Sequence, residues 1–189
     1  MDVRETDIPG VKVLRPQRFC DARGYFVETW NAARAAMAGV AAVFVQDNHS
    51  HSVAAGTVRG LHYQSPPCAQ GKLVRVARGA IRDVVVDARR GSPTYGRWIA
   101  EILSEENGLQ LWAPRGMLHG FVTLVPGTDV IYKVDAPYNA ACDGAVRFDD
   151  PDIGIEWGVA PSEVVLSDKD AAAPRFRDFD TPFVYDAAP

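Results

Sequence analysis

The sequence is short of cysteine, of positive charge and of long apolar runs. Its three cysteines, Cys20, Cys68 and Cys142, form no CxxC pair, and their odd number argues against a disulfide framework. No stretch approaches the roughly 18 apolar residues of a membrane span, and the polar, acidic N-terminus does not resemble a signal peptide. The formal net charge of −4 lacks the basic excess typical of nucleic-acid binders. These features predict a cytoplasmic protein with no membrane and no nucleic-acid partner.

The motifs of several enzyme classes are also missing. No serine lies in a G-x-S-x-G motif, so nothing supports a serine hydrolase. Neither G-x-G-x-x-G nor a Walker loop occurs, which removes the support for dinucleotide-binding and P-loop proteins. A nucleotide-sized anionic ligand remains compatible with the charge, because a few local arginines can hold one diphosphate.

The composition, 47% hydrophobic and 23% charged, is that of a folded globular protein, and we expect one domain over residues 1–189. Turn signals separate short runs that are rich in Val, Ile, Leu and Tyr, which predicts many short strands. We expect strands in the segments 72–79, 80–88, 96–103, 109–114, 119–125 and 129–135. One alanine-rich helix is predicted at 31–41, and turns with short helical pieces in the C-terminal third. This pattern favours an antiparallel sandwich or barrel over βαβ units.

Three of the four histidines lie within residues 49–62. His49 and His51 have the HxH spacing of some β-barrel metal sites, and His119 is a candidate for a distant third ligand. No Asp or Glu occurs in residues 52–58, so the ligand set is incomplete. We therefore expect His49 and His51 to lie partly exposed near a loop, with a metal site as the alternative.

His62 lies in the segment RGLHYQ. On a regular strand, alternation would place Arg59 and His62 on opposite faces, but Gly60 permits a bulge that brings both to one cavity. The alternative is a buried histidine that is satisfied by one carboxylate and one backbone group.

Two further side chains give His62 a chemical context. Lys72 opens the next strand, and Tyr132 lies within the strand DVIYKVD. A neutral imidazole can remove a proton next to a ketone, a cation can stabilise the enolate, and a phenol can return a proton to the opposite face. This set fits an epimerase. Asp83 and Asp87, by contrast, are expected to orient turn backbone and arginines.

Eight segments occur in a characteristic order: FCDARGYFVETW, VQDNHS, VRGLHYQSPPCAQGKLVRVARG, DVVVDARRGSPTYGRW, LSEENGLQLWAPRGMLHGF, VIYKVDAPY, DDPDIGIEW and LSDKD. Over roughly residues 3–175 the chain resembles the dTDP-4-dehydrorhamnose 3,5-epimerase family of dTDP-4-keto-6-deoxysugar epimerases. The resemblance implies an all-β cupin-type jelly roll, a double-stranded β-helix with short peripheral helices. It also implies a homodimer, a dTDP-sugar substrate, and catalysis with no metal and no organic cofactor.

The resemblance also implies roles for individual residues. His62 matches the base, Asp170 the carboxylate that orients it, Lys72 the residue near the C4 keto oxygen, and Tyr132 the acid. Substrate-binding positions are matched by Arg23, Glu28, Gln46, Asp47, Asn48, Arg59, Lys72, His119, Tyr138, Asp143 and Lys169, some of them across the dimer. Two positions depart from relatives, which often carry glutamate in place of Asp143 and arginine in place of His51. The second departure supports the expectation that His51 binds no metal.

The expected activity is conversion of dTDP-4-dehydro-6-deoxy-D-glucose to dTDP-4-dehydro-L-rhamnose by proton exchange at C3 and C5, a step of dTDP-L-rhamnose biosynthesis. One alternative is a 3- or 5-epimerase that inverts a single centre of a related sugar. Another is a non-catalytic cupin that binds a nucleotide sugar or a metal.

Overall fold

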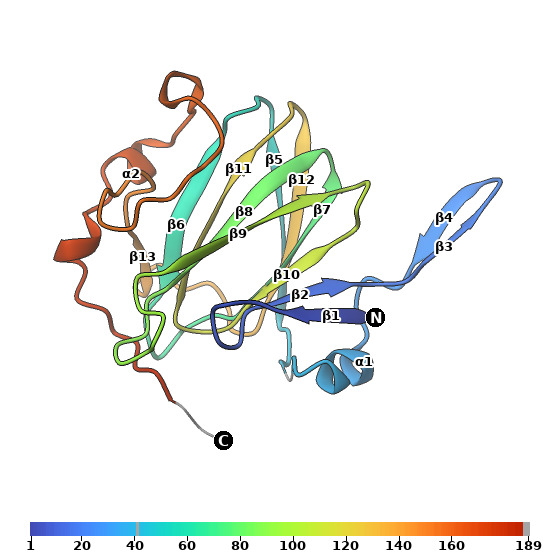
Figure 1. The fold of residues 1–189 in the computed structure, drawn as a ribbon, viewed down its shortest axis with the longest axis horizontal. Helices are drawn as coiled ribbons and strands as arrows, with labels where there is room; N and C mark the ends of the chain where they lie inside the picture. The colour runs from blue at the N-terminus through green and yellow to red at the C-terminus, as the bar shows by residue number, and fades with distance from the viewer. Residues whose placement is uncertain (41, 187–189) are drawn as a thin grey trace.

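The computed structural model describes residues 1–40 and 42–186. Its strands are β1 (Asp2–Glu5), β2 (Lys12–Arg15), β3 (Arg18–Asp21), β4 (Gly24–Val27), β5 (Gln46–Ser52), β6 (Val58–Gln64), β7 (Lys72–Arg78), β8 (Ala80–Asp87), β9 (Trp98–Ser104), β10 (Gln110–Ala113), β11 (Met117–Thr123), β12 (Thr128–Val134) and β13 (Asp143–Ala145). A six-stranded sheet has the order β1-β2-β10-β7-β12-β5, and a five-stranded sheet the order β13-β6-β11-β8-β9 (Figure 1). The predicted all-β cupin jelly roll is confirmed, as are strands in all six predicted segments.

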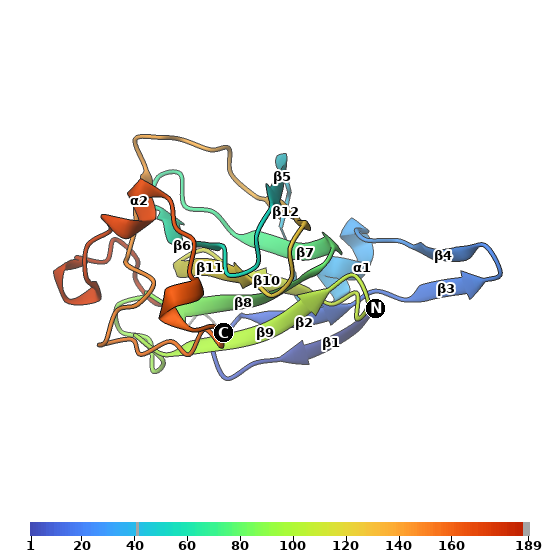
Figure 2. The ribbon, with the colours of Figure 1, turned by 90° about the horizontal axis from the view of Figure 1, so that it is seen from above.

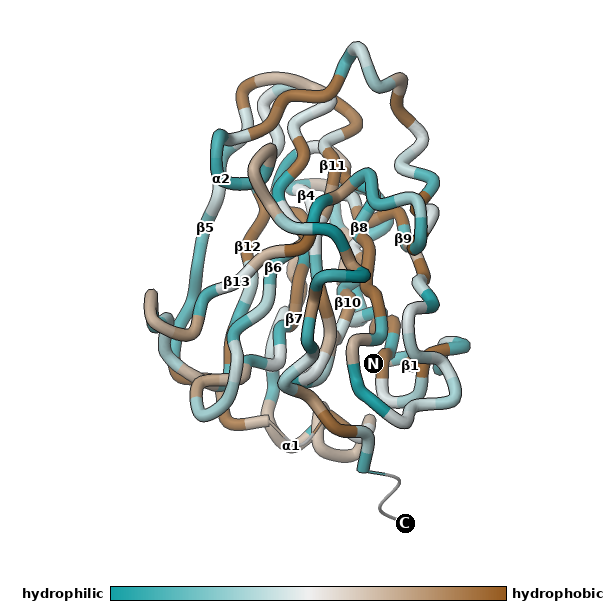
Figure 3. Tube along the Cα trace, turned by 90° about the vertical axis from the view of Figure 1, so that its left-hand side faces the viewer, coloured by the Kyte–Doolittle hydropathy of each residue, from teal (hydrophilic) through white to brown (hydrophobic). Residues whose placement is uncertain are grey.

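Alternating apolar residues hold the two sheets together. Val74 and Val76 of β7 point inward and pack in one buried cluster with Ile81 and Val85 of β8. Successive side chains of a strand point to opposite faces, so residues two apart share a face, and burial of each such side chain contributes about 1.5–3 kcal/mol. Figure 3 shows β5, with the sequence QDNHSHS, as a hydrophilic strand, which suits its place at the edge of the six-stranded sheet.

The C-terminal third covers the outer face of the five-stranded sheet (Figure 2). Trp157 and Phe179 pack there against Val84 and Leu118, in a second buried cluster. This segment contains the short helices η1 (Pro161–Glu163), α2 (Asp168–Ala171) and η2 (Phe176–Asp178). The prediction of turns and short helical pieces is thereby confirmed. The segment also brings α2 against β6, which positions part of the site described below.

The helix predicted at 31–41 is shorter than expected. Helix α1 spans Ala32–Met37, and the Asn31 side chain caps it by accepting a hydrogen bond from the Arg34 amide. Gly39, with φ of +75°, turns the chain out of the helix, since glycine adopts this conformation without a Cβ penalty. Ala41 lies outside the described residues. None of the helices in the described part of the chain has the length and apolar character needed to cross a membrane.

Strands β3 and β4 form a hairpin that projects from the sandwich as an arm (Figure 1). Phe19, Tyr25 and Phe26 on this arm are all more than half exposed, and Phe26 reaches 69%. Three large aromatic side chains exposed on one hairpin form an apolar surface of the kind that marks an interaction site.

Candidate active site

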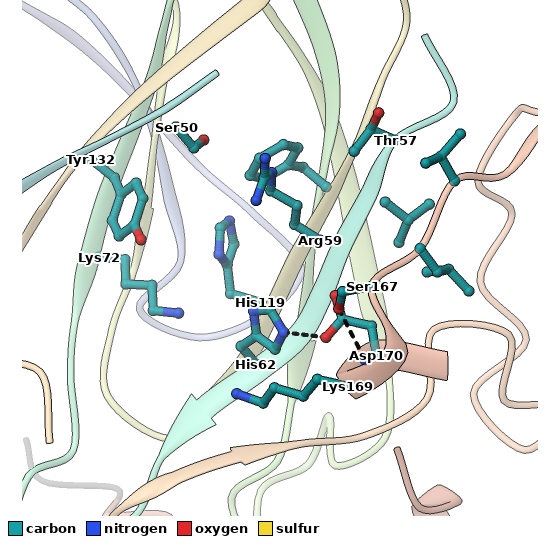
Figure 4. A pocket seen from close by; sticks show the side chains of 14 residues that line it. Ser50, Thr57, Arg59, His62, Lys72, His119, Tyr132, Ser167, Lys169 and Asp170 are labelled. Atoms are coloured by element: carbon teal, nitrogen blue, oxygen red, sulfur yellow. Dashed lines mark hydrogen bonds and ion pairs between the residues drawn. The ribbon is translucent and has the colours of Figure 1, made fainter. Parts of the chain in front are cut away.

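A cavity of about 380 Å³ lies between the two sheets and the segment that contains α2 (Figure 4). One wall comes from β6 and β11 of the five-stranded sheet, the opposite wall from β7 and β12 of the six-stranded sheet. Its lining comprises Ser50, Thr57, Val58, Arg59, His62, Lys72, His119, Phe121, Tyr132, Val165, Leu166, Ser167, Lys169 and Asp170.

A bulge in β6 brings Arg59 and His62 to the same cavity. His119 of β11 pairs with His62 and Phe121 with Arg59, so two residues of β6 stand opposite Gly120 alone. Gly60, with φ of +128°, permits this bulge, and a Cβ there would come within 2.6 Å of the Gly120 Cα. The expectation that Gly60 brings both side chains to one cavity is confirmed.

His62 is held by a carboxylate from the C-terminal segment. Its Nε2 lies 2.6 Å from Oδ1 of Asp170, which is nearly buried. Ser167 caps α2 by accepting a hydrogen bond from the Asp170 amide, and so fixes the turn that presents the carboxylate. Burial raises the pKa of Asp170, but the hydrogen bond and charge of His62, together with hydrogen bonds from the Gly60 amide and Ser167, hold that pKa below its ordinary value. With Nε2–H donating to this carboxylate, Nδ1 of His62 is left as the basic atom.

A second histidine–carboxylate pair lies beside the first. His119 Nε2 is 2.8 Å from Oδ1 of Asp83, and both side chains are buried. The prediction that Asp83 orients turn backbone and arginines is therefore wrong, because it lies mid-strand in β8 and faces inward. The same prediction is confirmed for Asp87, which accepts hydrogen bonds from the backbone and guanidinium of Arg89.

Lys72 and Tyr132 lie on the wall opposite Arg59 and His62 (Figure 4). Burial among protein groups lowers the pKa of Lys72 to about 8, although Asp143 and Asp83 act in the opposite direction. Burial likewise raises the pKa of the Tyr132 hydroxyl above its ordinary value, so the phenol keeps its proton at neutral pH. The wall therefore presents a cation that can lose its proton near neutrality and a neutral acid.

A second cavity, of about 400 Å³, adjoins the first and shares His62, Lys72, Tyr132 and Lys169 with it. Asp143 at its rim pairs with Lys169 and accepts a hydrogen bond of 3.3 Å from the Tyr138 hydroxyl. The pair with Asp143 raises the pKa of Lys169, which stays protonated. The other lining residues are Gln46, Asn48, Tyr63, Gln64, Gln70, Tyr138 and Asp143. The two cavities together offer a groove for a ligand longer than one sugar ring.

Three predicted binding residues lie outside both cavities. Arg23, at the tip of the hairpin arm, pairs with Asp21 at 2.6 Å, and Glu28 at its base pairs with Arg34 at 3.2 Å. Asp47 pairs with Lys133 on the outer face of the six-stranded sheet, although its neighbours Gln46 and Asn48 line the second cavity. Within this chain, the structure does not bring Arg23 and Glu28 to the other site residues, whereas Asp47 lines a third cavity together with Asn48 and Tyr132.

His49 and His51 lie in β5, with His51 one residue before the strand ends. Their side chains are 59% and 51% exposed, so the predicted partial exposure is confirmed. His49 Nε2 and His51 Nδ1 lie 3.0 and 2.8 Å from Oδ1 of Asp129. In residues 1–40 and 42–186, no group of three or more His, Cys, Asp or Glu residues is arranged to hold a metal ion. His119, the proposed third ligand, belongs to the other sheet and pairs with Asp83.

Sequence reasoning missed two positioning residues besides Asp83. Ser167 was recognisable, because a serine three residues before a carboxylate is a helix N-cap signal. Gln64 gave no such signal: its amide donates to the carbonyls of Cys68 and Pro137 and accepts from the Asn139 amide, joining two loops beside the second cavity.

Solved structures and curated relatives identify the class of protein. The fold matches the dTDP-6-deoxy-D-glucose-3,5-epimerase of Legionella pneumophila in complex with dTDP-4-keto-L-rhamnose, with a TM-score of 0.93 and 41% identity over 98% of this chain and 99% of that one. A 3′-monoepimerase from Streptomyces bikiniensis in complex with dTDP-quinovose matches with a TM-score of 0.82 and 32% identity over 90% and 85% of the two chains. The protein is therefore an isomerase of the sugar-nucleotide epimerase class.

The family follows from the sequence comparisons. Residues 5–178 match the dTDP-4-dehydrorhamnose 3,5-epimerase family. The curated dTDP-4-dehydrorhamnose 3,5-epimerase of Sinorhizobium fredii is 49% identical over 189 aligned residues, which cover 98% of this chain and 94% of the relative. The chain belongs to this family, as its ordered segments predicted.

Proposed function

We propose that the protein converts dTDP-4-dehydro-6-deoxy-D-glucose to dTDP-4-dehydro-L-rhamnose by exchanging protons at C3 and C5. The observation that carries this proposal is the His62–Asp170 pair, which lies across one cavity from Lys72 and Tyr132. A base on one wall and an acid on the other suit removal of a proton from one face of a ring and its return to the opposite face.

The first step is removal of a proton next to the C4 ketone. Nδ1 of His62 takes the C5 proton, while Asp170 holds the imidazole in the required tautomer and stabilises its charged form. Negative charge develops on the C4 oxygen, where the Lys72 ammonium stabilises the enolate. A pKa of about 8 leaves Lys72 mostly protonated at neutral pH and also able to share a proton with that oxygen.

The second step is reprotonation from the opposite face. Tyr132 delivers a proton to C5, and a comparable exchange follows at C3. A positioned base and acid contribute typically about 10²- to 10⁴-fold each, and a preorganised enolate site adds several kcal/mol. The ketone is already present in the substrate, so the exchange itself needs no change of oxidation state.

The remaining predicted residues are assigned to binding. His119, held by Asp83, and Arg59, which donates a 3.0 Å hydrogen bond to the His51 carbonyl, border the sugar in the first cavity. Lys169 and Arg59 supply positive charge for the diphosphate. In this proposal the second cavity holds part of the nucleotide, bounded by Gln46, Asn48, Tyr138 and Asp143.

We further propose a cytoplasmic homodimer in which the hairpin arm of one protomer lies on its partner. Phe19, Tyr25 and Phe26 are exposed on this arm and suit burial against a second copy. The same arm carries Arg23, and Glu28 follows it, so the dimer would bring these two predicted contacts to the partner's cavity. Asp47, on the outer face of the sheet, belongs to the same proposed shared surface.

The deciding experiment is incubation with dTDP-4-keto-6-deoxyglucose in D₂O, followed by mass and proton spectra of the sugar. The proposal requires deuterium at both C3 and C5. Deuterium at one centre would instead indicate a single-centre epimerase. This is the second candidate function, because the chain is similar to the Streptomyces 3′-monoepimerase. Tight binding of the nucleotide sugar with no label would show a non-catalytic binding protein.

A further inference from the structure

Two cysteines from distant parts of the chain meet beside the second cavity. Cys68 closes the turn that begins at Ser65, because its amide donates a 3.0 Å hydrogen bond to the Ser65 carbonyl. Cys142 directly precedes β13, and its carbonyl accepts a 2.8 Å hydrogen bond from the Ser65 amide. A turn of this kind keeps its first and fourth Cα atoms within about 7 Å. Ser65 is therefore hydrogen-bonded to both cysteines, which brings the two segments together.

The two cysteines share a second neighbour, Asn139. Asn139 donates its side-chain amide to Sγ of Cys68 at 3.3 Å, and its carbonyl accepts a 3.0 Å hydrogen bond from the Cys142 amide. The neighbouring Cys142 thiol is the main cause that raises the pKa of the Cys68 thiol above its ordinary value. Both cysteines are reduced and partly exposed. Small reagents can therefore reach the pair.

We propose that Cys68 and Cys142 form a redox-active dithiol that closes to an intramolecular disulfide in the presence of a low-molecular-weight disulfide such as oxidised glutathione. The thiolate of one cysteine attacks a sulfur of the oxidant, forms a mixed disulfide and releases one reduced thiol. The second cysteine thiolate then attacks the protein sulfur of that mixed disulfide and releases the second thiol. The two cysteine protons pass to the two leaving thiolates, and the oxidant takes up the two electrons.

The surroundings favour closure within the chain. Gln64 already joins the same two segments through its hydrogen bonds to Cys68, Pro137 and Asn139, so the thiols are held together before any bond forms. Such preorganisation favours attack by the second cysteine over other reactions of the mixed disulfide. The new bond joins the loop that leads to Lys72 with the strand that carries Asp143, at the rim of the second cavity.

Peptide mapping of the full chain tests the proposal without any assay of activity. The reduced protein is incubated with oxidised glutathione, alkylated with N-ethylmaleimide, digested and analysed by mass spectrometry. We expect Cys68 and Cys142 to lose reactivity toward N-ethylmaleimide, a Cys68–Cys142 linked peptide to appear, and dithiothreitol to reverse both changes. Because the bond closes a long loop, the melting temperature should rise by roughly 5–10 °C on oxidation.

Single-cysteine variants give the matched controls. Cys20, exposed on the hairpin arm, lies apart from the pair, so Cys20→Ser should oxidise like the wild type. Cys142→Ser and Cys68→Ser should each stop at one glutathione adduct on the remaining partner, with no rise in melting temperature. The proposal would be overturned if all three thiols could still be alkylated after oxidation. It would also be overturned if Cys68 and Cys142 both carried glutathione with no linked peptide. The peptide map of the wild-type protein alone distinguishes these outcomes.

Discussion

Nε2 of His62 lies 2.6 Å from Oδ1 of Asp170, although the two residues stand 108 positions apart in the chain. The carboxylate is 4% exposed and also lies 3.4 Å from the Gly60 amide, so it is held at the back of the imidazole. In this arrangement one ring nitrogen is committed to Asp170 and the other is available to substrate.

Replacing Asp170 with asparagine should lower kcat by about 10²- to 10⁴-fold, since an amide neither fixes the same tautomer nor stabilises the charged imidazole. Steady-state kinetics with the 4-keto sugar nucleotide measures the effect. Asp168→Asn, an exposed position in the first turn of the same helix, is the control and should keep near wild-type turnover. Equal losses in both variants would point to a disturbed α2 rather than to a role for this pair.

The lowered pKa of Lys72 should make turnover and stability change with pH in opposite directions. With its pKa lowered from 10.5 to about 8, Lys72 loses its charge above pH 8, and turnover should decline there as the enolate loses its cation. Stability changes the other way: between pH 8 and 10.5 the unfolded chain binds more protons than the folded one, so the Lys72 contribution to unfolding free energy rises with pH.

The variant Lys72→Met separates these effects. Turnover should fall by roughly 10²- to 10³-fold at pH 7, while the melting temperature at that pH stays the same or rises, because an unfavourably buried charge has been removed. Melting curves and kinetics from pH 6 to 10 provide the measurement. A melting temperature well below that of wild type at pH 7 would contradict the electrostatic argument.

Tyr132→Phe should uncouple proton removal from inversion. The base still removes a proton, but the acid on the opposite wall is gone, so deuterium should enter from D₂O while inversion slows by about 10²-fold or more. Comparing the rates of deuterium incorporation and of product formation tests this. Tyr95→Phe, at an exposed tyrosine between β8 and β9, should leave both rates unchanged. Equal slowing of the two rates in Tyr132→Phe would assign the phenol another role.

Asp83→Asn probes the second histidine–carboxylate pair. Oδ2 of Asp83 is buried without a hydrogen-bond partner among the described residues, so the carboxylate is retained at a cost in stability. We expect kcat/KM to fall by roughly tenfold or more as His119 loses its anchor, with little loss of melting temperature. A large drop in melting temperature with unchanged kinetics per folded molecule would make Asp83 purely structural.

The hairpin arm can be tested by association. The double substitution Phe19→Ser and Phe26→Ser should shift the protein from dimer toward monomer in analytical ultracentrifugation, weakening association by at least about tenfold. Met37→Ser, at a 91% exposed apolar residue of α1 outside the arm, controls for loss of surface hydrophobicity. A dimer of unchanged affinity in the double variant would remove the arm from the interface.

Local patterns predicted much of this fold. The strands at 72–79 and 80–88 follow from alternation of apolar residues, which fixes the face that each residue presents once the strand forms. The helix ends at Met37 because Gly39 turns the chain out of it, whereas the prediction for residues 31–41 rested on alanine content. The arm β3–β4 was not predicted, since its apolar residues have no core to face within this chain.

The sequence by itself determined the strand periodicity, the family resemblance and the residue types that proton exchange at a carbon next to a ketone requires. Only the tertiary structure decided which of these side chains meet. The bulge at Gly60 rotated Arg59 and His62 to one side, and the packing of the C-terminal segment on β6 brought Asp170 to His62. Partners such as Asp83 and His119, or Cys68 and Cys142, lie on strands and loops that are neighbours only in space. Pairing between strands depends on contacts at long sequence separation, which no local spacing records.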